Sequence, residues 1–227
     1  MLQFYYAPLS PNARRVWITL LEKGIDFEPN LLQLNGDQLQ ADFIEINPFH
    51  HIPVIVDDGF KVIESLAILD YLESKYPTPA LLPSESKALA QAKMVQMVTA
   101  NELFPKTIPL MCESSESPQF LQAVKHINIV LQFFTGIIGD RPFFVGEKLT
   151  LADIVAGTVL PFLPKLGVGL DNYPQLQNWC EHISQRPAWQ KTQLSDADFE
   201  EFKRRVRFLV RLHRREVNKN HQGDENK

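Results

Sequence analysis

The sequence contains only two cysteines, Cys112 and Cys180, among 227 residues, and this scarcity excludes a disulfide framework. The two form neither a Cys-x-x-Cys motif nor a spacing of metal ligands, so we expect both to be small hydrophobic side chains buried in the core. An unbroken apolar run of about 18 residues, as a membrane span needs, is also missing. The N-terminus has no basic segment followed by an apolar one, so we expect a cytosolic protein.

Neither sign of charge is in large excess over the whole chain, which carries 23 Lys or Arg, 27 Asp or Glu and a net charge of -4. Residues 203–219 hold eight of the basic residues against Glu216, which leaves 15 basic and 26 acidic residues, or -11, on the rest. Such an acidic body argues against a general nucleic-acid binder. The length suffices for two modest domains of about 100 to 150 residues each.

The first third of the chain alternates strand and helix signals. Strands are predicted at 2–7, 27–34, 52–56 and 59–63, and helices at 12–23, 38–46 and 64–76. Gly24 stands where a left-handed helix end belongs, and Asp57-Asp58-Gly59 is a hairpin signal. The order βαβ and then ββα predicts an α/β domain over residues 1–77.

The rest of the chain is predicted to be all helical. Pro79 and Pro83 mark a linker at 78–86, because no periodic pattern crosses it and strand signals stop after it. Helical periodicity follows at 87–110, 118–138, 151–163, 175–185 and 198–215. We therefore expect an α-helical domain at 87–217 and a flexible polar tail at 218–227. Thr150-x-x-Asp153 predicts a capping box with a purely structural role.

Three motifs give the chain from about residue 1 to 200 a resemblance to a known family. They are Asn47-Pro48-Phe49-His50-His51-Ile52-Pro53-Val54-Ile55, Ile63-Glu64-Ser65-Leu66-Ala67-Ile68-Leu69-Asp70-Tyr71-Leu72, and Leu149-Thr150-Leu151-Ala152-Asp153. In this order they resemble the soluble, cytosolic glutathione S-transferases. The resemblance implies a thioredoxin-like α/β domain with a mixed four-stranded sheet, and an all-α helical bundle. It also implies a cytoplasmic homodimer that conjugates glutathione to small electrophiles in detoxification, with glutathione as co-substrate.

The resemblance also implies a set of glutathione-binding residues. Pro53 would be a cis proline, and Ile52 before it would offer its backbone N–H and C=O to the peptide. Glu64 and Ser65 open a helix whose N-terminus suits the γ-glutamyl carboxylate, although Ser65 would also serve as a plain helix cap. His50 and His51 would lie near the glycyl carboxylate. Two adjacent histidines without a third ligand do not predict a metal site.

The thiol of glutathione must ionise before it attacks, and its pKa of about 8.5 has to be lowered for this. Ser10 matches the thiol-activating serine of the theta-like and delta-like classes. A serine followed by proline is equally typical of a helix N-cap. Tyr5, Tyr6 and Asn12 are the alternative donors, and Arg14 would support the site through a carboxylate or be a solvated helix residue. The Ser10 turn also resembles a bacterial chi-like subgroup, which implies isothiocyanates as electrophiles.

The electrophile would lie against the helical domain. Apolar side chains that could line its pocket, or simply pack in the core, are Phe104, Pro105, Ile108, Met111 and Phe162. The basic segment from Phe199 to Arg215 is typical of a solvated cationic helix face, with contact to a membrane surface or nucleic acid as the alternative.

Two other function classes fit the same fold. One is a non-catalytic interaction module, against which the presence of Ser10, Glu64 and Ser65 argues. The other is a glutathione-dependent thiol reductase, which requires a nucleophilic cysteine that residues 1–77 lack.

Overall fold

A computed structural model of the chain describes residues 1–33 and 36–224. Its N-terminal unit is built on four strands, β1 (Gln3–Tyr6), β2 (Glu28–Leu31), β3 (Val54–Asp57) and β4 (Phe60–Ile63). They are ordered β2-β1-β3-β4, with β1 and β2 parallel and the other neighbours antiparallel. The predicted mixed four-stranded sheet of a thioredoxin-like domain is thus confirmed.

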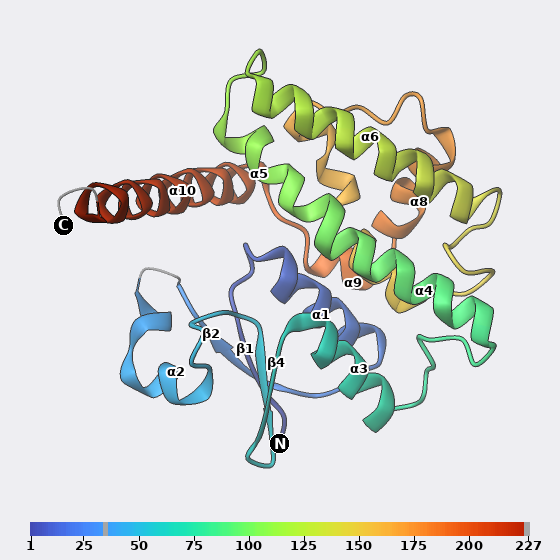
Figure 1. Cartoon of the computed structure of the whole chain (residues 1–227). Coiled ribbons are helices and arrows are strands. Elements are labelled where there is room, and N and C mark those ends of the chain that lie inside the picture. Colours follow the sequence, from blue (N-terminus) through green and yellow to red (C-terminus); the bar gives the residue numbers. More distant parts are fainter. Residues whose placement is uncertain (34–35, 225–227) are drawn as a thin grey trace.

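Helices cover the sheet on both sides. α1 (Pro11–Glu22) and α3 (Ser65–Lys75) pack against each other on the side that faces the helical unit (Figure 1). α2 (Ala41–Ile46), which follows a 3-10 turn at Asp37–Leu39, lies away from that unit over a small separate core of Leu32, Phe43 and Val54. This arrangement brings the N-terminal ends of α1 and α3 to the region between the two units.

The C-terminal unit is helical, as predicted. It contains α4 (Ser86–Val98), α5 (Phe104–Cys112), α6 (Pro118–Ile138), α7 (Leu151–Ala156), α8 (Pro174–Ser184), α9 (Pro187–Lys191) and α10 (Asp196–Asp224), with a π turn at Thr99–Leu103 and 3-10 turns at Leu160–Phe162 and Pro164–Leu166. α7 is buried along its whole length at the centre of the unit.

Among the described residues, α6 is long and apolar enough to cross a membrane, with a mean hydropathy of 1.3 in its most apolar window. Polar residues interrupt it, so the sequence shows no unbroken apolar run. One face of α6, including Ile127, Leu131 and Phe134, is buried in the core of the helical unit against α5 and α8. Its apolar character is therefore accounted for by packing between helices.

Several predicted helix boundaries differ from the structure. The predicted helix 87–110 is interrupted by the π turn, where the Phe104 N–H donates to the Thr99 carbonyl. Pro105 follows directly and has no N–H to continue the regular pattern. The predicted helix 151–163 ends at Ala156, before Gly157, and α9 was not predicted.

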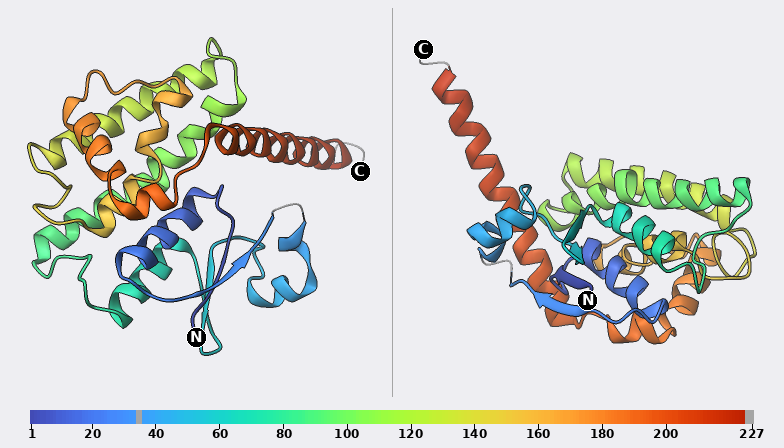
Figure 2. Two further views of the ribbon diagram at one scale, coloured as in Figure 1. Left: turned by 180° about the vertical axis from the view of Figure 1, so that it is seen from behind. Right: turned by 90° about the horizontal axis from the view of Figure 1, so that it is seen from below.

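α10 is longer than the predicted 198–215 and extends away from the rest of the molecule (Figures 1 and 2). Residues 218–224, predicted to be part of a flexible tail, continue this helix, because neither glycine nor proline occurs in it before Gly223. Residues 225–227 of that predicted tail lie outside the described residues.

Buried polar contacts tie α1 and α3 to the linker that leads to the helical unit. The Lys23 ammonium, whose side chain is fully buried, lies 2.6 Å from Glu73 Oε2 and donates to the carbonyls of Tyr76 and Pro79. Glu73 in turn accepts from the backbone N–H of Leu81. α1, α3 and the linker are thus joined at one point.

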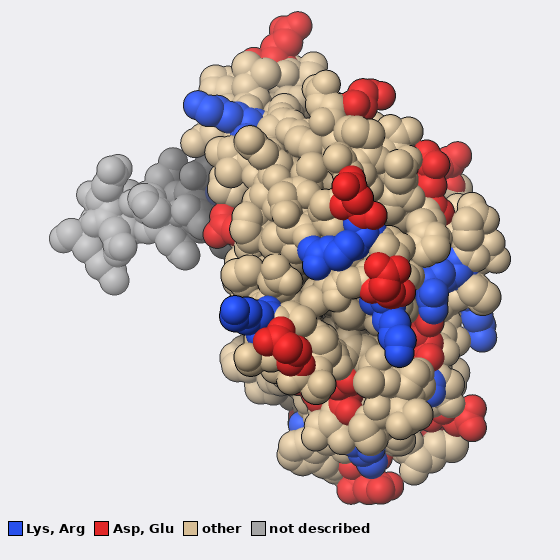
Figure 3. Space-filling view, turned by 90° about the vertical axis from the view of Figure 1, so that its right-hand side faces the viewer, with Lys and Arg blue, Asp and Glu red and all other residues tan. Residues whose placement is uncertain are grey.

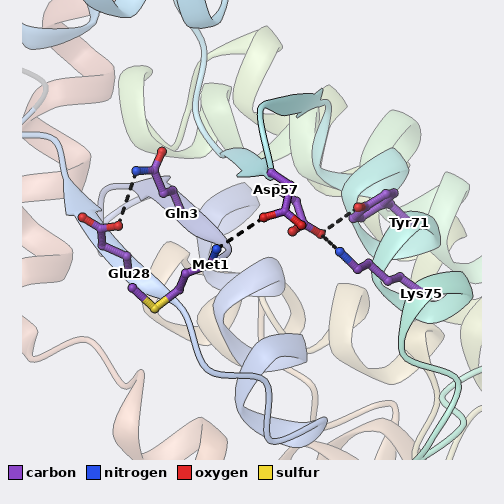
Figure 4. A network of polar contacts seen from close by, with 7 residues as sticks. Met1, Gln3, Glu28, Asp57, Tyr71 and Lys75 are labelled. Atoms are coloured by element: carbon purple, nitrogen blue, oxygen red, sulfur yellow. Dashed lines mark hydrogen bonds and ion pairs between the residues drawn. The ribbon is translucent and has the colours of Figure 1, made fainter.

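Asp57 closes β3 in a smaller network with side chains of α3 (Figure 4). Its carboxylate accepts from the Tyr71 hydroxyl at 2.7 Å and pairs with Lys75. The hydrogen bond from Lys75 lowers the pKa of Asp57. Burial acts in the opposite direction, and the hydrogen bond from Tyr71 lowers the pKa further. Elsewhere the surface carries mixed charge, with both signs interspersed over the face in Figure 3.

Candidate functional site

A cavity of about 750 Å³ lies between the two units. From the sheet unit it is lined by the loop after β1, the loop before β3 and the start of α3, and from the helical unit by Phe104 and the inner face of α10. Of the predicted site residues, the lining includes Ser10, Asn12, His50, His51, Ile52, Pro53, Glu64 and Ser65. Segments far apart in the sequence therefore meet at one place.

Ser10 stands at the N-cap of α1, with Pro11 as the first helical residue. Its Oγ accepts from the backbone N–H of Ala13 at 3.3 Å. A hydroxyl has one hydrogen to donate besides its acceptor lone pairs, so capping leaves the Ser10 hydrogen available to a group in the cavity. The capping role is therefore present and is compatible with donation to a ligand.

Glu64 and Ser65 form the start of α3. Glu64 has φ +64° and ψ 115°, an unfavourable backbone conformation for a residue with a side chain. Ser65 is buried to 8% exposure, and its Oγ lies 3.4 Å from the Nη1 of Arg15 on α1. No side-chain cap bond satisfies the first turn of α3, so its N–H groups and partial positive charge face the cavity side of the helix.

The loop before β3 is held by Asn47, which is buried to 2% exposure. Its Nδ2 donates to the His51 carbonyl at 2.8 Å, and its Oδ1 accepts from the Phe49 N–H at 3.0 Å. The Ile52–Pro53 peptide is cis, as the resemblance implied. Among the described residues, the backbone of Ile52 makes no hydrogen bond, so both its groups are free for an extended ligand.

The two histidines differ in their surroundings. His50 adopts φ +58°, and its Nδ1 lies 3.3 Å from the Gln38 carbonyl. His51 is exposed, and its backbone carbonyl accepts from Asn47 Nδ2. Within residues 1–33 and 36–224, no three His, Cys, Asp or Glu side chains gather closely enough to hold a metal ion.

Of the three alternative thiol activators, the two tyrosines lie away from the cavity. Tyr6 stacks on Phe4 inside the sheet core, and burial raises the pKa of its hydroxyl. The Tyr5 hydroxyl donates to Gln3 on the other side of the sheet, under α2. Neither tyrosine lines the cavity, whereas Asn12 does.

Arg14 does not line the cavity either, and the predicted carboxylate partner is absent among the described residues. Its side chain is buried and reaches the helical unit, where Nε donates to Thr192 Oγ1 at 3.3 Å and the guanidinium stacks 5.4 Å from the Phe162 ring centre. Burial lowers the pKa of Arg14 to about 10. It is neither a solvated residue nor part of the cavity wall.

Apolar side chains form the opposite wall. A small pocket of about 30 Å³ adjoins the large cavity, and the two share Phe104 and Phe202. Phe104, Met111 and Phe162 line this small pocket as the sequence suggested, while Pro105 and Ile108 do not. Phe162 stacks on Phe199 at 5.2 Å between ring centres and anchors the base of α10.

The inner face of α10 is the part of the site that sequence reasoning missed. It lines the cavity with Phe202, Arg205, Val206, Phe208, Leu209 and Leu212. The apolar residues at helical spacing were visible in the sequence, but they were interpreted as a solvated basic helix. The basic face itself is solvated as expected, since Arg204, Arg207, Arg211 and Arg214 are exposed. Arg205 and Arg207 also donate to the carbonyls of Gln33 and Met111, and Arg214 pairs with Glu113.

The cysteines stand apart from the cavity. Cys180 is buried as predicted, whereas Cys112 is half-buried at the end of α5. Burial raises the pKa of both thiols, that of Cys180 to about 12. Neither has the low-pKa environment of a redox-active cysteine.

Comparison with known proteins agrees with the two-unit structure. Residues 4–80 match the glutathione S-transferase N-terminal domain, and residues 72–187 match the glutathione S-transferase C-terminal domain. Glutathione S-transferase 3 of Zea mays is 34% identical over 208 residues, covering 84% of this chain and 92% of that protein. Glutathione S-transferase D7 of Drosophila melanogaster is 28% identical over 197 residues, covering 84% of this chain and 88% of that protein.

Among solved structures, a delta-class glutathione transferase of Nilaparvata lugens superposes with a TM-score of 0.78 at 25% identity, covering 91% of this chain and 98% of that one. Both domains of the chain, in the order found here, are accounted for by one family. The protein therefore belongs to the glutathione S-transferase family and is a glutathione transferase.

Proposed function

We propose that the cavity binds glutathione along its sheet-unit wall and a small hydrophobic electrophile along α5 and α10, and that the Ser10 hydroxyl activates the thiol. The assignment of Ser10 is supported by its position, because it lines the cavity at the N-terminus of α1. In the helix cap its Oγ acts only as an acceptor, so its hydroxyl hydrogen remains available to a ligand. Neither tyrosine at the end of β1 lines the cavity.

In this mechanism the glutathione thiol loses its proton to solvent water. The Ser10 hydroxyl donates a hydrogen bond to the sulfur and stabilises the thiolate, and the helix dipole of α1 adds positive potential. The thiolate then forms a sulfur–carbon bond with the electrophile. With an aryl halide the halide leaves with its bonding electrons. With an isothiocyanate the sulfur adds to the central carbon and the nitrogen takes up a proton.

The rest of glutathione has matching positions along the wall. The γ-glutamyl carboxylate would lie at Glu64, Ser65 and the start of α3, where unsatisfied N–H groups suit an anion. The cysteinyl backbone would pair with the free N–H and C=O of Ile52. His50 and His51 would lie near the glycyl carboxylate.

The test is the initial rate of conjugation to an aryl halide and an isothiocyanate by wild type, Ser10→Ala and Ser10→Asp. We expect both substitutions to lower kcat by about 100-fold, the cost of removing one hydrogen-bond donor aimed at developing charge. Aspartate retains the N-cap acceptor but has no hydrogen to donate at neutral pH. Because the aspartate charge also repels the thiolate, a lower kcat in both variants combined with wild-type thermal stability in Ser10→Asp assigns the loss to the thiolate interaction and not to the cap.

Ser117→Ala is the matched control, because Ser117 caps α6 through a 3.1 Å bond from Phe120 N–H and lies outside the cavity. Its activity should equal that of wild type. Undiminished activity in both Ser10 variants would assign thiol activation to Asn12 or to the α1 N-terminus. If wild type bound glutathione but turned over no electrophile, the non-catalytic alternative would replace conjugation.

Further assignments follow from the family resemblance. We assign residues 1–77 to the glutathione-binding domain, 78–86 to the linker and 87–217 to the helical domain. We propose a cytoplasmic location and a role in detoxification from the family relationship alone. We also propose a homodimer, which is supported by exposed Phe49, Phe60, Met94 and Met97 outside the cavity lining. Light scattering of wild type and Met97→Glu tests the dimer, with conversion to a monomer expected for the variant.

A further inference from the structure

Arg15 is the largest fully buried side chain of the described residues, with 1% of its surface exposed. It lies on α1, which packs against α3, and its Nη1 reaches Ser65 Oγ at 3.4 Å. Arginine is rarely buried without a partner, because taking its charge out of water is costly. Some interaction must therefore compensate the cost of burying this charged guanidinium.

The remaining polar atoms of Arg15 do not supply that interaction. Among the described residues, its Nε and Nη2 have no hydrogen-bond partner, and no carboxylate forms an ion pair with it. Burial lowers the pKa of Arg15 to about 10, so it remains a cation at neutral pH. Within the part of the chain that the structure describes, the one polar contact of its side chain is thus with a serine that lines the cavity.

This contact restricts what Ser65 can do. Because Ser65 Oγ accepts from the guanidinium, its own hydrogen must point elsewhere, and the cavity is the side on which the residue is exposed. A hydroxyl that accepts from a cation is also a stronger donor, since hydrogen bonds in a chain polarise one another. The arrangement therefore suits an anionic ligand group at the start of α3, where the helix dipole acts in the same direction.

We infer that Arg15 is a positioning residue for glutathione, which orients the Ser65 hydroxyl toward the γ-glutamyl carboxylate and supplies the buried positive charge behind it. This inference rests on the proposed placement of glutathione in the cavity. Arg15 itself does not line the cavity, so it acts through Ser65.

The test compares two ligands by titration calorimetry, without electrophile. One is glutathione, and the other is 4-aminobutyryl-cysteinyl-glycine, which lacks only the α-carboxylate of the glutamyl residue. Wild type should prefer glutathione, and Arg15→Met should reduce that preference by about tenfold, as expected for a hydrogen bond to a charged group. Arg15→Lys, which keeps the charge, should restore part of the preference.

Arg14→Met is the matched control, since Arg14 is the neighbouring buried arginine but contacts Thr192 and Phe162 rather than Ser65. It should leave the ratio of the two affinities unchanged. An Arg15→Met protein that binds both ligands more weakly by the same factor would show a merely structural role and overturn the inference.

The outcomes also separate this inference from the proposed function. A wild type that binds neither ligand would refute glutathione binding in the cavity, whereas normal preference in Arg15→Met would refute only the role of Arg15. Methionine fills a similar shape without the charge, so we expect this variant to fold. If it does not, Arg15→Gln and Arg15→Lys replace it, and a wild-type preference in Arg15→Gln would overturn the inference.

Discussion

The two walls of the cavity are built in different ways. The sheet-unit wall presents backbone groups and helix N-termini, held by Asn47, the Glu64 turn and the Ser10 cap. The helical wall presents apolar side chains from α5 and α10, with Phe104 and Phe202 shared between the large cavity and the small pocket. The first arrangement suits one polar ligand of fixed shape, and the second suits apolar ligands of varied shape.

This difference indicates on which wall a substitution can change specificity for the electrophile. A substitution on the sheet-unit wall disturbs backbone conformation and so affects the common co-substrate. A substitution on the helical wall changes only the shape and area of apolar contact. The family relationship thus carries over to the glutathione side more readily than to the choice of electrophile.

Phe202→Ala offers the strongest test of this separation. Loss of the ring from the shared edge of the two pockets should raise KM for an apolar electrophile by up to about tenfold, in line with the apolar area removed. KM for glutathione should stay the same. A parallel rise in KM for glutathione and KM for the electrophile would contradict separate roles for the two walls. Phe133→Ala, at an exposed position of α6, is the control and should change neither KM.

Thr150→Ala tests the stability of the helical unit, which carries the apolar wall. Thr150 and the fully buried Asp153 form the predicted capping box of α7, and Asp153 also accepts from Phe144 N–H and Trp179 Nε1. We expect the variant to lose about 1 kcal/mol, seen as a thermal midpoint lower by a few degrees. Thr135→Ala, which removes a non-capping hydroxyl from α6, should change the midpoint less.

Lys75→Met gives the smallest effect and concerns the sheet unit. Lys75 lowers the pKa of Asp57 in the folded state, so this pair stabilises the fold above the unfolded pKa of about 4 and stops doing so as pH falls through the folded pKa. The variant should be less stable than wild type at pH 7, with the difference shrinking in acid. Lys125→Met, which removes an exposed lysine, is the control in urea titrations at both pH values.

The sequence predicted the sheet-unit wall well and the helical wall poorly, for a physical reason. Pro53, Glu64 and Ser65 belong to short continuous motifs whose local backbone geometry is set by neighbouring residues. Phe202 and Leu209 reach the cavity only because α10 packs beside α5, a tertiary contact that periodicity does not reveal. Arg15 was equally invisible, since its burial depends on the packing of α1 against α3.

The buried Lys23 contact bears on how ligands enter and leave. Because it joins α1 and α3 to the linker, a hinge movement that bends the linker at this point has to break buried polar contacts. α10 is secured at its base by Phe199 but leaves Phe208 and Leu209 60% exposed further along. We therefore expect substrate and product to pass on the α10 side of the cavity, where the covering side chains are already exposed.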